Sequence, residues 1–295
     1  MTPLPAATPH KSFSLARVYA IASNTLLELV RLKVFYFLLL FALLSIGITF
    51  MVSKFGFQEQ FQMLRNGSLG GMRIFTWLLA VLATAMILPK DIEERTLYTI
   101  LAKPVPRFEY LLGKLAGVLA LLGMAVSLMV AVFVLVLYAQ QQAALAETLR
   151  QVAPGPDLEA AQQQIRASTF TGNLVPGIAL LYLQAAVCAA LTLLISTFAT
   201  SSIFTIIVSV CIIIIGHIQP IAREYWVTEK GASAMAKVFF ALVALFIPDM
   251  RAFDLLDDLA VAIPFGLFTE TAGLGLLYIT IYFLVGYFMF AGKEL

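Results

Sequence analysis

The segment LAGVLALLGMAVSLMVAVFVLVLY, residues Leu115–Tyr138, decides the fold class of this chain. It carries no Asp, Glu, Lys or Arg, and it is longer than the roughly 20 apolar residues that a helix needs to cross a hydrocarbon core of ~30 Å. The segment therefore predicts a membrane-spanning α-helix.

The composition of the whole chain leads to the same class. Of the 295 residues, 61% are hydrophobic and only 12% are charged, compared with about 25% charged residues in an average soluble domain. The mean hydropathy is +0.94, so there are too few polar residues to cover a water-soluble fold. Disorder and a disulfide-stapled secreted domain are excluded. The net charge of +2 leaves no strong basic field, and no nucleic-acid partner is expected.

Further apolar stretches predict an all-α integral membrane protein with six transmembrane helices in the lipid bilayer. The N-terminal tail 1–13 precedes a single domain over 14–295. Arg73 and Lys90 flank the short second span, where they can reach the two membrane interfaces. Two shorter stretches, Val238–Ile247 and Leu259–Phe268, suggest interfacial or re-entrant helices. The six predicted spans are Val34–Val52, Ile74–Leu88, Leu115–Tyr138, Leu174–Phe198, Ile203–Ile218 and Thr271–Ala291.

Basic residues near the spans predict the orientation. Cytoplasmic loops carry an excess of Lys and Arg, counted in short segments close to the spans. Loop 89–114 contains Lys90, Arg95, Lys103, Arg107 and Lys114. We therefore expect this loop and both termini in the cytoplasm of a multi-pass protein of the cell (inner) membrane. Loops 53–73, 139–173 and 219–270 are then expected outside.

An amphipathic helix is expected before the first span, over 14–33. Its apolar residues keep to one face of a 3.6-residue period, and its charged residues fall on the opposite face. This pattern favours a helix lying in the cytoplasmic interface, with a cytosolic extension of the first span as the alternative. The apolar face is Leu15, Val18, Tyr19, Ala22, Leu26 and Leu29, and the polar face is Arg17, Asn24, Glu28 and Arg31.

Loop 89–114 contains a second amphipathic helix with clear start and stop signals, expected over 91–103. Acidic residues stand where a helix N-terminus favours negative charge, and Lys103 stands where the C-terminus favours positive charge. Pro104 cannot continue the hydrogen-bond ladder. Two interpretations fit these signals equally well. The helix is either a rigid element that a soluble partner binds, or an ordinary helix between two spans. The acidic residues are Asp91, Glu93 and Glu94, and the apolar face is Leu97, Ile100 and Leu101.

Three short motifs around this helix resemble a known cytoplasmic signature. The stretches EERTL (93–97), LAKPVPR (101–107) and YLLGK (110–114) look like the signature of ABC type-2 transporter permeases. The most similar subgroup is that of the nitrous-oxide-reductase maturation permease. Arg95 stands where that family often has Gly, and Pro106 where it often has Ser.

The resemblance implies a coupling helix that docks on a separate ABC ATPase subunit. It implies a permease subunit, here an exporter of an unidentified substrate, paired with a second permease chain in a homodimer or heterodimer. ATP and Mg²⁺ would be bound by the ATPase partner, and this chain would hold no cofactor. A non-transporting scaffold that anchors an envelope complex is the alternative. The implied contact residues are Asp91, Glu93, Glu94, Thr96, Leu97, Ile100, Leu101, Lys103, Pro104 and Arg107.

Several catalytic signatures are missing from the sequence. There is no Gly-x-x-x-x-Gly-Lys-Ser/Thr loop to cradle phosphates, and the two histidines, His10 and His217, are too isolated for an ordinary zinc site. We therefore expect no enzyme and no metal. Gln184 is the most polar residue deep in a span, and Thr192 and Ser196 follow it. A hydrogen bond between helices is the main expectation for Gln184, and a substrate path along these three residues is the alternative.

The loop 139–173 is expected to form a helical hairpin. Residues 139–152 and 157–168 are rich in good helix formers and are separated by Pro154-Gly155-Pro156. A docking site for an outer-face envelope partner, a lid and a solvated spacer remain open as its role. In loop 219–270, four aspartates are expected to form an exposed acidic surface; they are Asp249, Asp254, Asp257 and Asp258.

Overall fold

The computed structural model describes most of the chain. The described residues are 13–52, 57–93, 105–151, 155–170, 172–199, 201–224, 246–254 and 264–292, with the single positions 235, 238 and 243. In these ranges the chain is all-helical, without a strand, as the sequence predicts. The elements are α1 Leu15–Val30, α2 Lys33–Val52, α3 Phe57–Glu93, α5 Arg107–Gln151, α6 Pro156–Thr169, α7 Leu174–Phe198, α8 Ser202–Glu224, the 3₁₀ turn η2 Arg251–Phe253 and α10 Phe265–Ala291.

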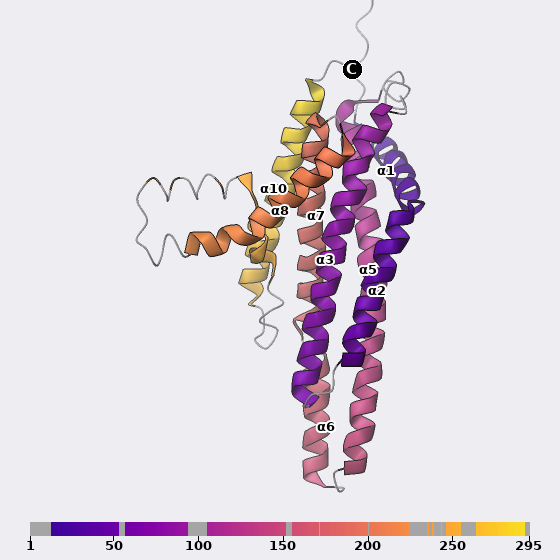
Figure 1. Ribbon diagram of the computed structural model, residues 1–295, viewed down its shortest axis with the longest axis vertical. Coiled ribbons are helices and arrows are strands. Elements are labelled where there is room, and N and C mark those ends of the chain that lie inside the picture. Colours follow the sequence, from indigo (N-terminus) through magenta and orange to yellow (C-terminus); the bar gives the residue numbers. More distant parts are fainter. Residues whose placement is uncertain are drawn as a thin grey trace, which may run out of the picture.

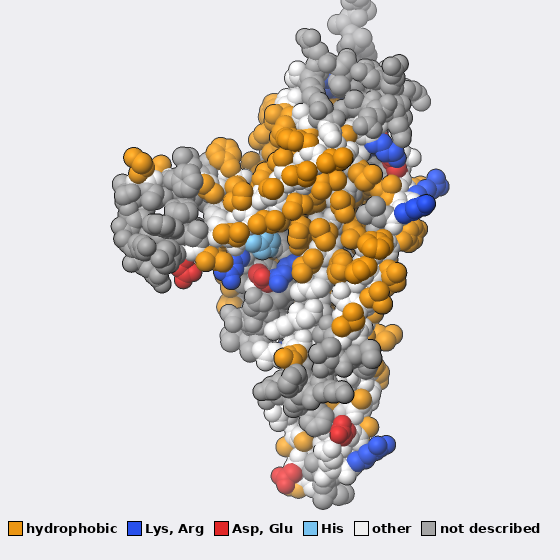
Figure 2. Space-filling model, in the orientation of Figure 1, with side chains coloured by type: hydrophobic (Ala, Val, Ile, Leu, Met, Phe, Trp, Pro, Cys, Tyr) orange, Lys and Arg blue, Asp and Glu red, His pale blue; other side chains and the backbone are white. Residues whose placement is uncertain are grey.

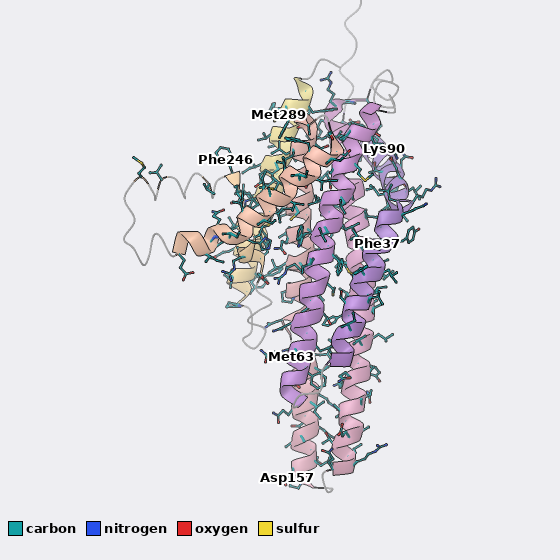
Figure 3. The ribbon with its side chains drawn as sticks, in the orientation of Figure 1. Phe37, Met63, Lys90, Asp157, Phe246 and Met289 are labelled. Atoms are coloured by element: carbon teal, nitrogen blue, oxygen red, sulfur yellow. The ribbon has the colours of Figure 1, made fainter. Side chains whose placement is uncertain are left out.

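The helices form an elongated bundle with two distinct ends (Figure 1). From α2 onward, successive long helices run in alternating directions. One end holds α1, the last turns of α3, the start of α5 and the C-terminal end of α10, and we call it the junction end. The opposite end holds the turn between α5 and α6, and we call it the hairpin end. In Figure 3, Lys90 lies at the junction end and Asp157 at the hairpin end.

The length and apolarity of the helices make this a multi-pass membrane protein. Five helical stretches are long and apolar enough to cross a bilayer: Phe61–Asp91, Arg107–Gln151, Pro156–Phe198, Ser202–Ile221 and Phe265–Ala291. The pair Leu15–Val30 and Phe35–Ile48, bent by 68°, passes the same test as one unit, which makes up to six. Figure 2 shows that hydrophobic side chains cover much of the described surface between the two ends, as lipid contact requires.

Helix α7 is the centre of the bundle and packs against α3, α5, α8 and α10. Its sequence suits this position because small side chains let neighbouring helices approach closely. Ala185, Ala186, Ala189 and Ala190 are all buried. By contrast, α8 exposes one strongly apolar face, as at Ile203 and Ile207, and buries a face that carries Thr205 and Ser209.

At the hairpin end, three helical segments form a stalk. They are the first half of α3, the second half of α5, and α6. Phe61, Ala144 and Ile165 form its apolar cluster. The buried Arg65 donates from Nη1 to the carbonyl of Ser168 at 3.0 Å. The predicted hairpin is therefore helical, as expected. Its first helix is the uninterrupted continuation of α5, and its second helix is α6.

Three sequence-based boundaries are wrong. Residues 57–73, expected as a loop, are the first half of α3, because Phe61, Leu64 and Leu69 are buried against other helices. The expected loop 219–270 is helical up to Glu224, and α10 begins at Phe265, so 265–268 is not part of a separate short helix. Most of Val238–Ile247 and residues 259–263 lie outside the described residues.

Candidate functional site: an ionic junction of α1, α3 and α5

Helix α1 lies in a notch on α5 that two glycines create. A Cβ added at Gly113 would lie 2.7 Å from the Cβ of Ile21, and one at Gly117 would lie 2.7 Å from the Cβ of Thr25 and 2.8 Å from the carbonyl oxygen of Ala22. Real side chains do not approach so closely, so only glycine permits this crossing. The spacing of four residues places both glycines on the same face of α5.

The packing explains why the buried face of α1 differs from the predicted one. Val18, Thr25 and Leu29 are buried, whereas Leu15 and Tyr19, expected on the same apolar face, are exposed. Docking into the glycine notch uses one half of the broad apolar side and leaves the other half uncovered. Whether α1 lies in a membrane interface remains a prediction.

An ion pair fastens the beginning of α1 to the beginning of α5. Arg17 donates to both carboxylate oxygens of Glu109, from Nε at 2.5 Å and Nη2 at 2.8 Å, and the backbone N–H of Ser14 donates to Oε1 at 2.9 Å. Glu109 precedes the apolar run of α5. The hydrogen bond from Arg17 holds the pKa of the Glu109 carboxyl below its ordinary value. The contact therefore stabilises the fold above the ordinary carboxyl pKa, and this stabilisation is lost as the pH falls through the lowered pKa.

A second, buried ion pair connects the end of α3 to α5. The Lys114 ammonium lies 2.7 Å from Oδ2 of Asp91, and the hydroxyl of Tyr110 donates to the same oxygen. Lys114 and Asp91 are almost completely buried, and Tyr110 is fully buried and stacked on Phe290 of α10. The Lys114 ammonium also lies 5.7 Å from the centre of the Tyr110 ring. A buried charge needs such compensation, because its desolvation is costly.

Glu28 of α1 connects the two flanks of the predicted coupling loop. Lys90 donates to its Oε1 at 2.6 Å, and Lys114 lies 4.0 Å from its Oε2. Lys90 is in the last turns of α3, and Lys114 is in the second turn of α5. The residues Arg17, Glu28, Lys90, Asp91, Glu109, Tyr110 and Lys114 together form what we call the ionic junction.

Arg107 ties the start of α5 to the end of α10. Its Nη1 donates to the carbonyl oxygens of Phe290 at 3.1 Å and Ala291 at 2.8 Å. These are among the last carbonyls of α10, where a positive charge also meets the negative end of the helix dipole. Phe108 adds edge contacts to Phe283 and Tyr287. The ionic junction is thereby connected to a fourth helix.

The structure assigns new surroundings to some of the predicted contact residues. Asp91 and Glu93 end α3, so they are in the last turn of one helix and not in the first turn of another. The carboxylate of Asp91 is buried, and Arg107 is bonded to α10. The helix expected over 91–103 otherwise lies outside the described residues, and so do Glu94, Thr96, Leu97, Ile100, Leu101, Lys103 and Pro104. Their docking role remains a prediction.

The residues of the possible substrate path are all buried in α7. Gln184 donates to the backbone carbonyl of Met250 at 3.0 Å, so its partner is an irregular segment and not another helix. Thr192 donates to the carbonyl of Cys188 within its own helix at 2.8 Å. Ser196 is buried, and its hydroxyl has no partner among the described residues. Their role in a path remains a prediction.

Sequence reasoning did not identify the members of the ionic junction as partners. Lys114 was counted only as one positive charge of a loop, and Glu28 only as part of a polar helix face. A usable signal was present, because Glu109 and Lys114 are charged residues just before an apolar run, where an uncompensated charge would be costly. Their partners are distant in sequence, and no local pattern shows which helix supplies them.

The charges of the ionic junction are engaged with one another, and these contacts hold the ends of α1, α3 and α5 in one arrangement. In the described ranges, no three His, Cys, Asp or Glu residues are grouped so that they could hold a metal ion. No protein-family model matches the sequence, and no curated protein matches it.

Proposed function

We propose that this chain is the membrane-spanning permease subunit of an ABC transporter that exports a substrate across the cell inner membrane. It crosses the bilayer six times, with both termini and the junction end in the cytoplasm and the stalk outside. It pairs with a second permease chain, and separate ATPase subunits bind ATP and Mg²⁺. The motif residues between 93 and 114 are the principal sequence support.

The observation that carries the proposal is how the two ends of the predicted coupling loop are joined. This loop lies between α3 and α5 in the sequence, and Asp91 and Lys114, near its two ends, are paired in the ionic junction. A partner that moves this loop therefore acts on α3 and α5 together, and on α1 through Glu28 and the glycine notch. Such a coupled set of helix ends is what a coupling loop requires to transmit force.

The sequence also supports a division of labour between two polypeptides. A P-loop supplies backbone N–H groups and a lysine to ATP phosphates. Gly113-Lys114 and Gly292-Lys293 lack the upstream glycine and the following Ser or Thr of that motif. In addition, Lys114 is already bonded to Asp91. ATP hydrolysis is accordingly assigned to the partner subunit.

The test is the substitution Leu97→Asp in the predicted coupling helix. Burying a leucine at an interface contributes roughly 1.5–3 kcal/mol. Since about 1.4 kcal/mol corresponds to a factor of ten in affinity, ATPase binding should weaken at least about tenfold. The chain would be purified from its native membrane, and the co-purifying ATPase, its stimulation and its affinity would be measured. Membrane insertion should be unchanged.

Two further variants make the result interpretable. Glu159→Ala changes an exposed residue of α6 at the opposite end and should leave ATPase binding unaltered. Arg95→Gly installs the residue common in the resembling family and should have a much smaller effect than Leu97→Asp. If the purified chain brings down no nucleotide-binding protein, or if Leu97→Asp binds the ATPase normally, the proposal is wrong.

A further inference from the structure

Residues 246–254 form an irregular segment that contacts four helices, and we call it the strap. At its start, the hydroxyl of Tyr282 on α10 donates to the carbonyl of Phe246 at 3.0 Å. At its end, Asp254 forms an ion pair with Arg73 of α3. Figure 3 shows Phe246 on the side of the bundle where α8 and α10 lie.

The middle of the strap is hydrogen-bonded to both α7 and α8. The backbone N–H of Met250 donates to the carbonyl of Gly216 on α8 at 3.2 Å, and its carbonyl accepts from Gln184 on α7 at 3.0 Å. The side chain of Met250 is fully buried, and that of Phe253 nearly so. A single residue thus bridges two consecutive helices through its backbone, and its side chain is buried.

Two glycines form the seat of the strap. A Cβ added at Gly216 would lie 2.7 Å from the carbonyl oxygen of Pro248, and one added at Gly275 of α10 would lie 2.6 Å from Cδ2 of Leu183 on α7 and 2.9 Å from Cε1 of Phe253. A methyl group at Gly216 would therefore push the strap outward, whereas one at Gly275 would meet both α7 and the strap.

The strap lies close to the second membrane boundary. Arg73 lies 17 residues before Lys90 along α3, which corresponds to roughly 26 Å of helix. This is close to the ~30 Å thickness of a hydrocarbon core. The side chains of Arg73 and Asp254 are partly exposed, with 22% and 16% of their surfaces accessible, while the two paired atoms, Nη1 of Arg73 and Oδ1 of Asp254, are buried.

The buried face of α8 carries polar atoms that lack partners. Oε1 of Gln219, one helical turn beyond Gly216, and Oγ of Ser209 are buried without a hydrogen bond to any described residue. A buried polar atom of this kind is unfavourable and calls for a physical reason. Water reaching this face of α8 would supply the missing hydrogen-bond partners.

We propose that the strap is a movable closure, held in its seat by the Arg73–Asp254 ion pair, and that its displacement hydrates the face of α8 carrying Gln219 and Ser209. The role of the strap as the outer gate of a permease depends on the proposed function. The displacement of the strap does not depend on that function, because the displacement requires neither the ATPase nor nucleotide.

The experiment measures how fast a thiol under the strap reacts with a water-soluble methanethiosulfonate reagent. The reporter is Gln219→Cys in a Cys211→Ser background, and the Cys211→Ser chain without the reporter gives the contribution of the buried Cys188. With the strap seated, the reaction should be slow. Asp254→Asn removes an ion pair between partly exposed side chains and should raise the rate about fivefold. Exchanging the charges, with Arg73→Asp and Asp254→Arg together, should return the rate toward that of the parent.

A second variant displaces the strap without changing a charge. Gly216→Ala introduces a methyl group that meets Pro248 and Met250 of the strap and should also raise the rate. Gly273→Ala on α10 is the control, because nothing lies within 4 Å of a Cβ at that position. Size-exclusion elution confirms that each variant is folded, and Gly216→Ala still decides the question if Asp254→Asn is not.

The outcomes separate the strap from the transport proposal. Parent-like reaction rates in folded Asp254→Asn and Gly216→Ala would overturn the strap as a movable closure, and so would an equal rise in Gly273→Ala. If both variants react faster and adding the ATPase with ATP also accelerates the parent, the strap is the outer gate. If both variants react faster and nucleotide has no effect on the parent, the strap is confirmed and the proposed transport cycle fails.

Discussion

Lys114 is the residue on which the ionic junction depends most, because its ammonium group is buried and meets both Asp91 and Glu28. Taking two charges out of water is costly, and only good geometry with additional hydrogen bonds offsets that cost. Here Tyr110 supplies the additional bond to Asp91. Removing one partner leaves the other charge buried and uncompensated, which is worse than having neither.

Lys114→Met should therefore destabilise the fold by about 3–5 kcal/mol, measured as a lower melting temperature of the purified protein in detergent. The matched change Lys90→Met removes the other partner of Glu28, in a pair of which about a third of each side chain is exposed. Its cost should be about 1 kcal/mol or less. The double variant Asp91→Asn with Lys114→Met should recover part of the lost stability. Equal melting temperatures for Lys114→Met and Lys90→Met would contradict this view of the buried pair.

At the scale of single residues, the sequence indicated which residues belong to the site but not which residues they contact. The motifs drew attention to Asp91 and Arg107, and both are engaged at the junction end. The partner of Arg107 is a pair of backbone carbonyls 183 and 184 residues away, which no side-chain pattern reports. Asp91 was expected to face a partner subunit because the start signals of a helix do not reveal tertiary burial.

At the scale of elements, the notch between α1 and α5 gives a prediction in which two effects have opposite signs. Gly117→Ala raises the helix propensity of α5, which alone should stabilise by about 1 kcal/mol. The new Cβ, however, would lie 2.8 Å from the carbonyl of Ala22, so α1 must shift, at a cost of about 1–3 kcal/mol. We expect a net lower melting temperature and faster thiol labelling of Leu29→Cys, which is buried on α1.

Gly123→Ala is the control for this test. A Cβ at that position would make an ordinary contact of 3.7 Å with Tyr182, so only the gain in helix propensity remains. This variant should be neutral or more stable than the parent. A more stable Gly117→Ala, with unchanged labelling at position 29, would show that α1 is not held in the notch.

Two helix boundaries were predicted closely from the sequence. The expected segments Val34–Val52 and Leu174–Phe198 agree with the bounds of α2 and α7 within one residue at each end. The first half of α3 was missed because Asn66, Gly67, Gly70 and Gly71 suggest a loop. Contacts with α5 and α6 outweigh these local preferences. The strap could not be predicted either, since its structure comes from partners on four separate helices.

For the whole molecule, the alternation of long helices places α1 and the last turn of α10 at the junction end (Figure 1). Single cysteines at Ala16 and Gln163, both exposed, test the orientation in a background lacking Cys188 and Cys211. An impermeant maleimide applied to intact cells or spheroplasts should label position 163 on α6 and not position 16 on α1. The positive charges near the junction end are the physical reason. Labelling at position 16 alone would invert the orientation.

The unbroken length of α5 has a geometric consequence. Its 45 residues span about 68 Å. The same helix carries part of the ionic junction at one end and forms one of the three helices of the stalk at the other. A tilt of about 5° around the junction end would sweep the far tip through about 6 Å. Small rotations at one face of the membrane are therefore amplified into displacements larger than a water molecule at the other, with no flexible joint in between.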